Sequence, residues 1–565
     1  MILGLNCAYH ESAAALIDGE GRIVAAAEEE RFTGRKHGKP VRSDNAHHLP
    51  AHAIRFCLRA GGVTWRDLRA VAYSLHPELR RAAPFTGPDT DPGAFGHHAA
   101  EAAFLESLNR VPRLIAQETS APFFFVPHHA AHAWYAMATS PYERAAVFVA
   151  DGIGECASVS AGIATRYLLQ LEQVAAVPDS IGMAWEKVSR YVGLTEYDAC
   201  KVMALAGTAT DVRPLSPDRL FSFRDGGLWV DQKNLILDFP NDYSGLDALL
   251  GSRRDPHRPK PVTAPEHKRL AAGLQRATER FLVAAAAQLV ERCGERTLVY
   301  GGGVALNCRA NHVLAASGVV DHLHVGPATH DAGTALGAAW HAYTLTSRRP
   351  IPVQDPSLIL FSGPDVAGDA AALHRAGWQK HPGIQDDLHT LVEALLQGHP
   401  IGWLDGRGEF GPRALGARSI LASPLIPGAV TRVNQLKGRH EFEPLALSVP
   451  EEDAPSLFVV PEPARDLSQL MLTTSYPTPG ARPKLQHVLH RDGTTRLQIV
   501  KPSLTPRLHA LLRAFGERSE LPLLVNTSFN PRGDPMPATL TQALPMVDRL
   551  GLSYLAINGR LWMSP

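Results

Sequence analysis

The chain has 565 residues, which is too long for a single hydrophobic core, because single cores stop growing at roughly 250 to 300 residues. Two to four folding units are therefore expected. Its 56 basic residues equal its 56 acidic ones, so no net field draws it to nucleic acid or an anionic membrane, and any phosphate site must be local. Six scattered cysteines without CxxC spacing exclude a disulfide or zinc-ribbon scaffold and favour reduced thiols.

The chain start and the apolar runs predict a soluble cytoplasmic protein. No cationic segment precedes the first apolar stretch, and His10 and Glu11 follow too early for a signal peptide. The longest apolar run, 281–290, is shorter than the ~18 residues of a membrane helix. We therefore expect no membrane partner and no nucleic-acid partner.

Strand-like and helical segments alternate along the first 350 residues. Apolar runs predict strands at 2–8, 13–17, 22–27, 122–126, 145–150 and 297–300. Alanine-rich stretches predict helices at 268–292 and 332–345. The pattern is that of an α/β fold.

A segment dense in proline and turn residues, 347–364, predicts a domain boundary, with one domain at 1–350 and another at 360–565. Within the second domain we expect a helix at 386–397, a strand at 400–404 and a glycine-rich loop at 405–416.

The first candidate site is a histidine pair. His128 and His132 are four residues apart, so on a helix their imidazoles lie on one face, at the spacing of a chelating pair. A divalent ion would need further ligands, and Asp151 and Asp331 stand at strand-to-loop exits. On spacing alone, the alternative of local capping or packing stays open, because the chain has 26 histidines.

Three glycine-containing loops follow predicted strands. Gly301, Gly302 and Gly303 separate a strand from a helix start, which lets backbone N–H groups approach a phosphate, although a structural turn explains a glycine triplet equally well. Loops at 4–12 and 151–154 are similar. Together they favour an actin-like fold, in which two related halves close over ATP.

Basic residues are concentrated in the second domain, and they predict an anion pocket. They are Arg407, Arg413, Lys437, Arg439 and Arg496. Guanidinium groups match phosphate oxygens bidentately. The alternative is that these arginines are solvated on the surface. The apolar neighbours of Arg413 argue against that alternative, because they indicate a shaped and partly apolar site. Asn526 and Ser528 follow a buried-looking strand, where ligands of open α/β sheets bind, although a simple turn is the alternative.

Taken in order, the motifs resemble one family along almost the whole chain. They include HxSAAAL at 10–16, AEEERFT with KH at 27–37, HHxxHA at 128–133, ADGxGE at 150–155, KVMALA at 201–206, GGGVALN at 301–307, HDAGTALGAA at 330–339 and RxEFGPRALGxRSIL at 407–421, then DGTxRxQ and NTSFN. The chain is similar to the O-carbamoyltransferases that include the nodulation protein NodU and the cephamycin and aminoglycoside (nebramycin synthase-like) enzymes.

The resemblance implies an actin-like (Kae-type) amino-terminal domain with duplicated halves and a YrdC-like α/β carboxyl-terminal domain. The second domain would make carbamoyl-adenylate from carbamoyl phosphate and ATP, and the first would transfer the carbamoyl group to a hydroxyl of a small molecule, expected to be a secondary metabolite. A homodimer is compatible with the sequence.

The resemblance also assigns residues. Iron, Fe²⁺ or another divalent ion, would be bound by His128, His132, Asp151 and Asp331. The nucleotide would be held by Lys36, Gly301, Gly302, Gly303, Asn307 and His330, and carbamoyl phosphate by Arg413, Lys437, Arg439, Arg496, Asn526 and Ser528. His10 would accept the proton of the attacking hydroxyl, which requires an imidazole that is partly neutral near pH 7, as its ordinary pKa of ~6.5 allows.

Three residues depart from the family pattern. Gly207 follows KVMALA where relatives continue Pro-Tyr-Gly, Glu11 replaces a more common aspartate, and Glu443 stands where many relatives carry arginine, which removes an expected anion contact.

Two other functions fit parts of the sequence. A small-molecule kinase would use the first domain's loops, and a nucleotide-binding switch would need neither His10 nor the histidine pair. Acceptor specificity is expected in the loops 75–115 and 208–265, which carry no interpretable motif.

Overall fold

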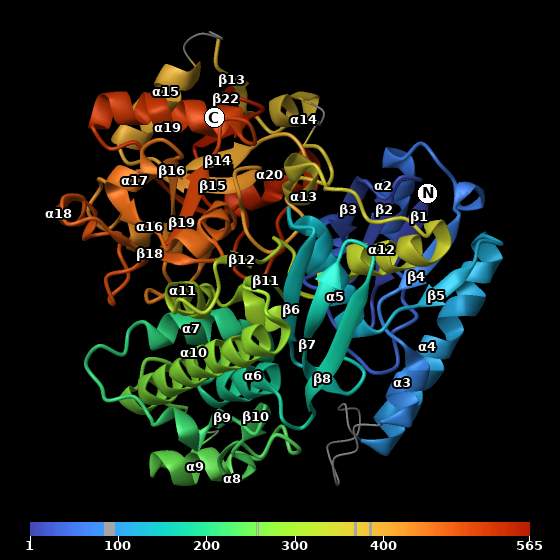
Figure 1. The fold of residues 1–565 in the computed structure, drawn as a ribbon. Helices are drawn as coiled ribbons and strands as arrows, with labels where there is room; N and C mark the ends of the chain where they lie inside the picture. Colours follow the sequence, from blue (N-terminus) through green and yellow to red (C-terminus); the bar gives the residue numbers. More distant parts are fainter. Residues whose placement is uncertain (84–96, 256, 258, 367–369, 383–386, 565) are drawn as a thin grey trace.

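The computed structural model describes residues 1–83, 97–255, 257, 259–366, 370–382 and 387–564. Within these residues the strands form two five-stranded sheets, one ten-stranded sheet and a short hairpin (Figure 1). The part of loop 75–115 between 84 and 96 lies outside the described residues.

The two five-stranded sheets share one topology. The first has the order β3-β2-β1-β4-β5 and the second the order β8-β7-β6-β11-β12. In each, the first three strands along the chain pair antiparallel and the last two are added in parallel. The strands are β1 (Ile2–Asn6), β2 (Ala13–Ile17), β3 (Ile23–Glu28), β4 (Ala70–Tyr73), β5 (Phe123–Phe125), β6 (Arg144–Ala150), β7 (Ala157–Thr165), β8 (Leu169–Ala176), β11 (Thr297–Gly301) and β12 (His322–His324). This repeat confirms the predicted duplicated halves.

Two equivalent helices lie between these sheets. Helix α5 (His128–Thr139) follows the last strand of the first half, and α12 (Thr334–Ser347) follows the last strand of the second. The apolar face of α12 packs on β1 and β2, and α5 packs on β6 and β11. They touch closely, because a Cβ added to Gly337 of α12 would lie 1.8 Å from the carbonyl oxygen of Ala131 in α5.

Other helices cover the outer faces of the sheets. Leu3 and Leu5 of β1 pack against α2 (Ala51–Ala60) and α4 (His98–Glu118), whereas the second sheet packs against α6 (Ile181–Tyr191), α10 (Pro265–Cys293) and α11 (Cys308–Ala316). Alanine-rich α10 begins with proline at its first position and ends at Gly294, whose φ is 66°. The remaining elements are α1 (Glu30–Thr33), α3 (Pro77–Ala82), α7 (Ala199–Ala206), α8 (Gln232–Leu235), α9 (Ser244–Leu250) and the hairpin β9 (Phe221–Arg224) and β10 (Gly227–Val230).

The carboxyl-terminal part is a second α/β unit around a mixed sheet of order β13-β22-β21-β14-β15-β20-β16-β19-β18-β17. Its strands are β13 (Gln379–Lys380), β14 (Ile401–Leu404), β15 (Arg418–Ala422), β16 (Ala446–Pro450), β17 (Phe458–Val459), β18 (Thr474–Pro477), β19 (Thr495–Val500), β20 (Leu524–Ser528), β21 (Tyr554–Ile557) and β22 (Arg560–Met563). Its helices are α14 (Ala370–Arg375), α15 (Asp387–Leu396), α16 (Ala429–Lys437), α17 (Ala454–Leu457), α18 (Arg482–Leu485), α19 (Pro506–Ser519) and α20 (Leu540–Arg549). The predicted helix at 386–397 and strand at 400–404 are confirmed as α15 and β14, with residue 386 outside the described part.

The proline-rich segment between the two parts packs on the first sheet. It contains α13 (Pro356–Leu360), and the N–H of Ala26 donates to Ser362 O at 3.1 Å. The N–H of Ile23 donates to Gln354 Oε1 at 3.0 Å. The segment is therefore anchored to β3 rather than free.

No helix in the described ranges combines the length and apolarity that crossing a membrane would require.

Candidate metal centre and anion site

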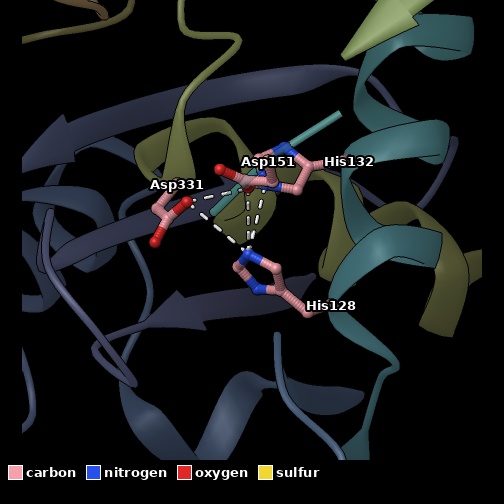
Figure 2. A group of neighbouring side chains, drawn as sticks. All are labelled: His128, His132, Asp151 and Asp331. Atoms are coloured by element: carbon pink, nitrogen blue, oxygen red, sulfur yellow. Dashed lines mark hydrogen bonds and ion pairs between the residues drawn. The ribbon is translucent and has the colours of Figure 1, made fainter. Parts of the chain in front are cut away.

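Two imidazoles and two carboxylates converge at the junction of the two halves (Figure 2). His132 Nε2 lies 2.8 Å from Asp151 Oδ2 and 3.5 Å from Asp331 Oδ1. His128 Nε2 lies 3.5 Å from Asp331 Oδ1, 3.6 Å from Asp151 Oδ2 and 3.2 Å from His132 Nε2. All four side chains are buried. The structure thus brings together the four predicted metal ligands.

The fold explains why residues so distant in sequence meet. His128 and His132 lie in the first turns of α5, Asp151 follows β6, and Asp331 begins the short 3-10 helix Asp331–Gly333 that leads into α12. Because α5 and α12 pack on each other between the sheets, the carboxyl end of β6 and the start of α12 face the same helical surface. Glu155 Oε1 accepts the N–H of His128 at 2.9 Å and thereby caps α5.

The polar atoms of this cluster fit a metal ion. Ser74 O lies 3.0 Å from His128 Nδ1 and fixes that nitrogen as the donor, which leaves Nε2 free to coordinate. Asp151 Oδ2 is buried and accepts no well-directed hydrogen bond. Two imidazole nitrogens and two carboxylate oxygens are a donor set that suits a first-row divalent ion.

The electrostatics agree with this assignment. Burial lowers the pKa of His128, but Asp331 and Asp151 outweigh burial and hold that pKa well above its ordinary value. Burial raises the pKa of Asp151, but His128 and His132 hold it well below its ordinary value. Protons and a cation therefore compete for the same buried negative charge.

A second cluster surrounds Glu11 beside the metal ligands. Glu11 Oε1 lies 2.6 Å from His37 Nδ1 and 3.7 Å from His10 Nδ1, and Glu11 Oε2 lies 3.8 Å from His330 Nε2. Glu11 and His37 have φ values of 59° and 65°, in the left-handed region that non-glycine residues rarely occupy. Such backbone strain is typical of functional sites.

His10 differs from the near-neutral imidazole that the sequence suggested. Burial lowers its pKa, but Asp331, Glu11 and Glu186 outweigh burial and raise the pKa of His10 to about 10. The negative charges of these three carboxylates favour the protonated imidazole. Asp331 and Glu186 are far from His10 in sequence, and Glu11 is the next residue, with a strained backbone. A cation on Asp331 would offset part of this charge.

The glycine loop joins the metal centre directly. Gly302 has a φ of 93°, and an added Cβ would lie 2.2 Å from Ala150 O, so only glycine fits. The N–H of Gly303 donates to Asp151 Oδ1 at 3.2 Å. The loop's backbone therefore orients a metal ligand.

Two residues expected at the nucleotide site have protein partners. Asn307 Oδ1 accepts the N–H of Ala310 at 3.0 Å and caps α11, and its amide bonds to Gln275 Oε1 at 2.9 Å. Lys36 Nζ lies 3.0 Å from both carboxylate oxygens of Glu30. His330 is buried with Nδ1 lacking a partner.

Two predicted anion-binding arginines form the centre of a positive cluster. Burial and the neighbouring Arg413 lower the pKa of Arg496 to about 10. In both residues the buried Nε has no hydrogen-bond partner, and no ion pair within 4.0 Å is found for either among the described residues. Both residues are half-buried, and leaving a buried Nε without a partner is costly unless an anion compensates it.

The loop that carries Arg413 is folded around a buried carboxylate. Glu409 Oε1 accepts the N–H groups of Leu415 at 2.8 Å, Ala417 at 2.8 Å and Arg418 at 3.1 Å. Arg413 Nη2 donates to Leu306 O at 3.4 Å, in the glycine loop that follows β11 in the second half. The anion cluster therefore borders the loop that leads to the metal centre.

The other residues predicted to bind carbamoyl phosphate are engaged with the protein. Arg439 Nε lies 3.0 Å from Glu443 Oε2. Glu443, which stands where many relatives carry an arginine, therefore neutralises the Arg439 guanidinium. Lys437 Nζ donates to Ser528 O and to Asn530 O, and it holds the loop after β20. Asn526 Nδ2 donates to Gln498 Oε1 at 2.8 Å, while its buried Oδ1 has no partner.

Several residues of these sites were missed by reasoning from sequence. Glu11 and His37 lie in motifs but carried no assigned role, and Glu186 and Tyr197 had no signal at all. Tyr197 lies 4.5 Å from His37 and 5.8 Å from His10, measured between ring centroids. The only sequence signal for this cluster was the motif HxSAAAL at 10–16, which follows a predicted strand at a turn.

The chain belongs to the carbamoyltransferase family. It matches the family described as "Carbamoyltransferase N-terminus" over residues 1–81 and 98–340, and "Carbamoyltransferase C-terminus" over residues 392–563. The protein is an enzyme of the carbamoyltransferase class, as predicted, and the kinase and switch interpretations lose their support.

Named relatives agree with this classification. The chain is 32% identical to nodulation protein NolNO of Sinorhizobium fredii (strain NBRC 101917 / NGR234), over 98% of this chain and 79% of that protein. It is 34% identical to the 3'-hydroxymethylcephem-O-carbamoyltransferase of Amycolatopsis lactamdurans, over 53% of this chain and 55% of that protein.

Solved structures resemble parts of the chain. The crystal structure of T. kodakarensis HypF aligns with a TM-score of 0.35 and 13% identity, over 61% of this chain and 48% of that one. A TM-score this low supports no inference about function.

Proposed function

We propose that the protein is an ATP-dependent O-carbamoyltransferase that works in two steps at two sites. The carboxyl-terminal domain, 360–565, forms carbamoyl-adenylate, and the amino-terminal domain, 1–350, transfers the carbamoyl group to an acceptor hydroxyl. The observation that carries the proposal is the adjacency of an unpaired arginine cluster and a buried His₂Asp₂ centre across the loop at Leu306.

In the first step, water cleaves carbamoyl phosphate into carbamate and inorganic phosphate. A carbamate oxygen then attacks the α-phosphorus of ATP, the bond from that phosphorus to the β-phosphate oxygen breaks, and pyrophosphate leaves. Arg413 and Arg496 bind the phosphate of carbamoyl phosphate, since their Nε groups are buried and unpartnered. Arg439 contributes less than the sequence suggested, because Glu443 pairs with it. Lys437, Asn526 and Ser528 shape the pocket.

In the second step, the acceptor hydroxyl oxygen attacks the carbamoyl carbon, and the bond from that carbon to the adenylate oxygen breaks. AMP leaves with the electron pair, and His10 takes the proton of the hydroxyl. A cation bound to Asp331 would lower the pKa of His10 from about 10 toward the range in which the imidazole is neutral and can accept that proton. Gly301, Gly302 and Gly303 present backbone N–H groups to the nucleotide, with His330 and Lys36 at its periphery.

The metal ligands are His128, His132, Asp151 and Asp331, and Fe²⁺ is the ion that we propose. When bound, a divalent ion here supplies Lewis-acid polarisation of phosphate or carbonyl oxygens. Glu11 keeps His10 and His37 in place through its two oxygens.

The acceptor is proposed to be a hydroxylated secondary metabolite, and the setting the cytoplasm. The six cysteines are all unpaired, which fits a reducing compartment.

Isotope labelling tests this function. With carbamoyl phosphate labelled at carbon, we expect the label in the acceptor only when ATP is present, with AMP and pyrophosphate as by-products detected by mass spectrometry. Formation of ADP with an unlabelled, phosphorylated acceptor would contradict the proposal.

A further inference from the structure

The glutamine that ends the DGTxRxQ motif, Gln498, has no role in the two steps proposed above. It lies in β19 two residues after Arg496, so both side chains point to the same face of the sheet. Gln498 is buried, and both ends of its amide group are hydrogen-bonded. Its Nε2 donates to Leu415 O at 2.7 Å, and its Oε1 accepts the hydroxyl of Ser448 at 2.6 Å and Asn526 Nδ2 at 2.8 Å. The amide therefore links the sheet to the loop that contains Leu415.

The orientation of this amide determines the orientation of its neighbour. Leu415 O is a backbone carbonyl, which can only accept, so the NH₂ end of Gln498 faces it and the oxygen end faces Asn526. Asn526 must then turn its own NH₂ end toward Gln498, where Ser448 Oγ, at 3.1 Å, is a second acceptor. The atom left over is Asn526 Oδ1, which is buried and has no hydrogen-bond partner among the described residues. A buried acceptor without a partner is costly, so we expect a ligand to supply a donor there.

The register of the sheet places this acceptor in the anion cluster. Asn526, Ala446 and Arg496 are paired in register on the adjacent strands β20, β16 and β19, so their side chains share one face of the sheet. Ala446, between the other two, has only a methyl group as its side chain. The amide nitrogen of Asn526 also lies 3.4 Å from Ala414 O, next to Arg413. Asn526 therefore contributes an acceptor where the two arginines contribute donors.

Carbamoyl phosphate needs both kinds of partner. Its phosphate and carbonyl oxygens accept hydrogen bonds, and its amino group is its only donor. The guanidinium groups of Arg413 and Arg496 can bind the oxygens but not the amino group, because a guanidinium group has no acceptor. Acetyl phosphate has a methyl group in place of the amino group, and it would leave Asn526 Oδ1 buried without a partner. The acceptor atom thus selects against acyl phosphates that lack an N–H group.

We propose that Gln498 is a positioning residue that makes the site selective for the carbamoyl group, because it fixes the amide of Asn526 so that Oδ1 accepts an N–H of the bound substrate. Gln498 itself does not touch the substrate and acts through Asn526. The inference rests on the proposed binding of carbamoyl phosphate at Arg413 and Arg496, and it adds the group that distinguishes this donor from other acyl phosphates.

Two stable analogues that differ at the discriminating group test the proposal by isothermal titration calorimetry on the full-length chain. Phosphonoacetamide carries the amino group of carbamoyl phosphate, and acetonylphosphonate carries a methyl group at the same position. Inorganic phosphate is the third probe, and it reports on the arginines. We expect the wild type to bind phosphonoacetamide at least tenfold more tightly than acetonylphosphonate. Equal affinity for the two analogues would overturn the proposal.

Removing the amide of Gln498 should remove this preference. In Gln498→Met, which keeps the length of the side chain, we expect the preference to fall below threefold. Inorganic phosphate should still bind within threefold of the wild type, because Glu409 Oε1 continues to hold the backbone of the loop that carries Arg413. Gln354→Met is the matched control, since the amide of Gln354 is also buried and hydrogen-bonded at both ends but lies beside β3, and it should keep the full preference. An unchanged preference in Gln498→Met would contradict the proposal.

A double-mutant cycle distinguishes positioning from a general loosening of the pocket. Asn526→Leu deletes the acceptor itself, and we expect it to lose the same preference as Gln498→Met. Because Gln498 acts through Asn526, the double variant should show no further loss, whereas additive losses would reveal an independent role of Gln498 and overturn the proposal. Thermal unfolding shows whether each variant is folded, and Gln498→Leu takes the place of Gln498→Met if that variant is not.

Pyrophosphate release from ATP and carbamoyl phosphate, measured on the same samples, separates the inference from the proposed function. Its absence in every sample would contradict the two-step function, whereas the analogues report on the pocket alone, without ATP or an acceptor. Failure of all three probes to bind the wild type would contradict the anion site and the inference together.

Discussion

At the scale of single residues, partners decide the role of each side chain. The spacing of His128 and His132 is compatible with plain packing, and the carboxylates of Asp151 and Asp331 make the pair a candidate metal centre. Likewise, Glu443 forms an ion pair with Arg439, whereas Arg413 and Arg496 have no ion pair within the ranges that the structure describes. Residues of the same type therefore have different partners within the same cluster.

Removing one of the proposed ligands should weaken metal binding. We expect His128→Ala to bind iron at least tenfold more weakly, because it deletes one of four buried donors. His129→Gln is the matched control, since His129 is buried on the same helix but its Nδ1 lies 2.8 Å from Ser160 Oγ and it is not among the four ligands. Elemental analysis of purified protein gives the metal content, and equal iron in the two variants would remove this centre.

The buried carboxyl group of Glu186 should lower the free energy of unfolding near neutral pH. Burial raises its pKa to about 6, although His10 and Arg190 oppose the shift. Between about 4.5 and about 6 the unfolded chain releases the proton before the folded protein does, so this carboxyl lowers the free energy of unfolding as pH rises through that window.

Glu186→Gln removes that penalty, and we expect it to stabilise the protein by about 1 to 2 kcal/mol at pH 7 but by almost nothing at pH 4. Urea unfolding at both pH values measures the difference. A destabilised variant at pH 7 would show that Glu186 is paired as an anion.

At the scale of elements, the sequence predicted more of the fold than of the sites. Alternating apolar runs located β1, β2, β6 and β11 and the alanine-rich helices α10 and α12 within a few residues. It could not reveal that α5 and α12 pack on each other, because that contact depends on Gly337 facing Ala131. The raised pKa of His10 and the pairing of Glu443 depend on such tertiary contacts and were equally out of reach.

The close packing of α5 and α12 is testable at one glycine. A Cβ at Gly337 would lie 1.8 Å from Ala131 O, so Gly337→Ala must separate the helices. We expect a loss of about 1 to 3 kcal/mol or more in the free energy of unfolding, and weaker metal binding. Gly480→Ala, where a Cβ meets no atom within 4 Å, should have little effect on either. If Gly337→Ala binds metal as strongly as the wild type, metal binding does not depend on the close packing of α5 and α12.

At the scale of the whole molecule, the two parts share an apolar core and are also joined by buried polar contacts. Arg31 Nη2 donates to Gly411 O at 2.6 Å, and Glu28 Oε1 accepts the N–H of Gly411 at 2.9 Å. These bonds tie the first sheet to the loop that carries Arg413, so the transfer site and the anion cluster are held in one arrangement. In the proposed two-step reaction, this arrangement would protect the reactive adenylate from water.

Weakening this junction should uncouple the two steps. We expect Arg31→Ala to keep pyrophosphate release while the yield of carbamoylated product per ATP falls several-fold, because the intermediate escapes and hydrolyses. Arg42→Ala, which removes only an exposed pair with Asp44, is the control. Unchanged coupling in Arg31→Ala would argue against a role of this contact.

The central claim, two chemical steps at two sites, is tested most directly by measuring pyrophosphate release and carbamoylated product together in His10→Asn and Arg413→Ala. We predict that His10→Asn still releases pyrophosphate and forms no product, whereas Arg413→Ala loses both. Loss of pyrophosphate release in His10→Asn, or its persistence in Arg413→Ala, would contradict the account.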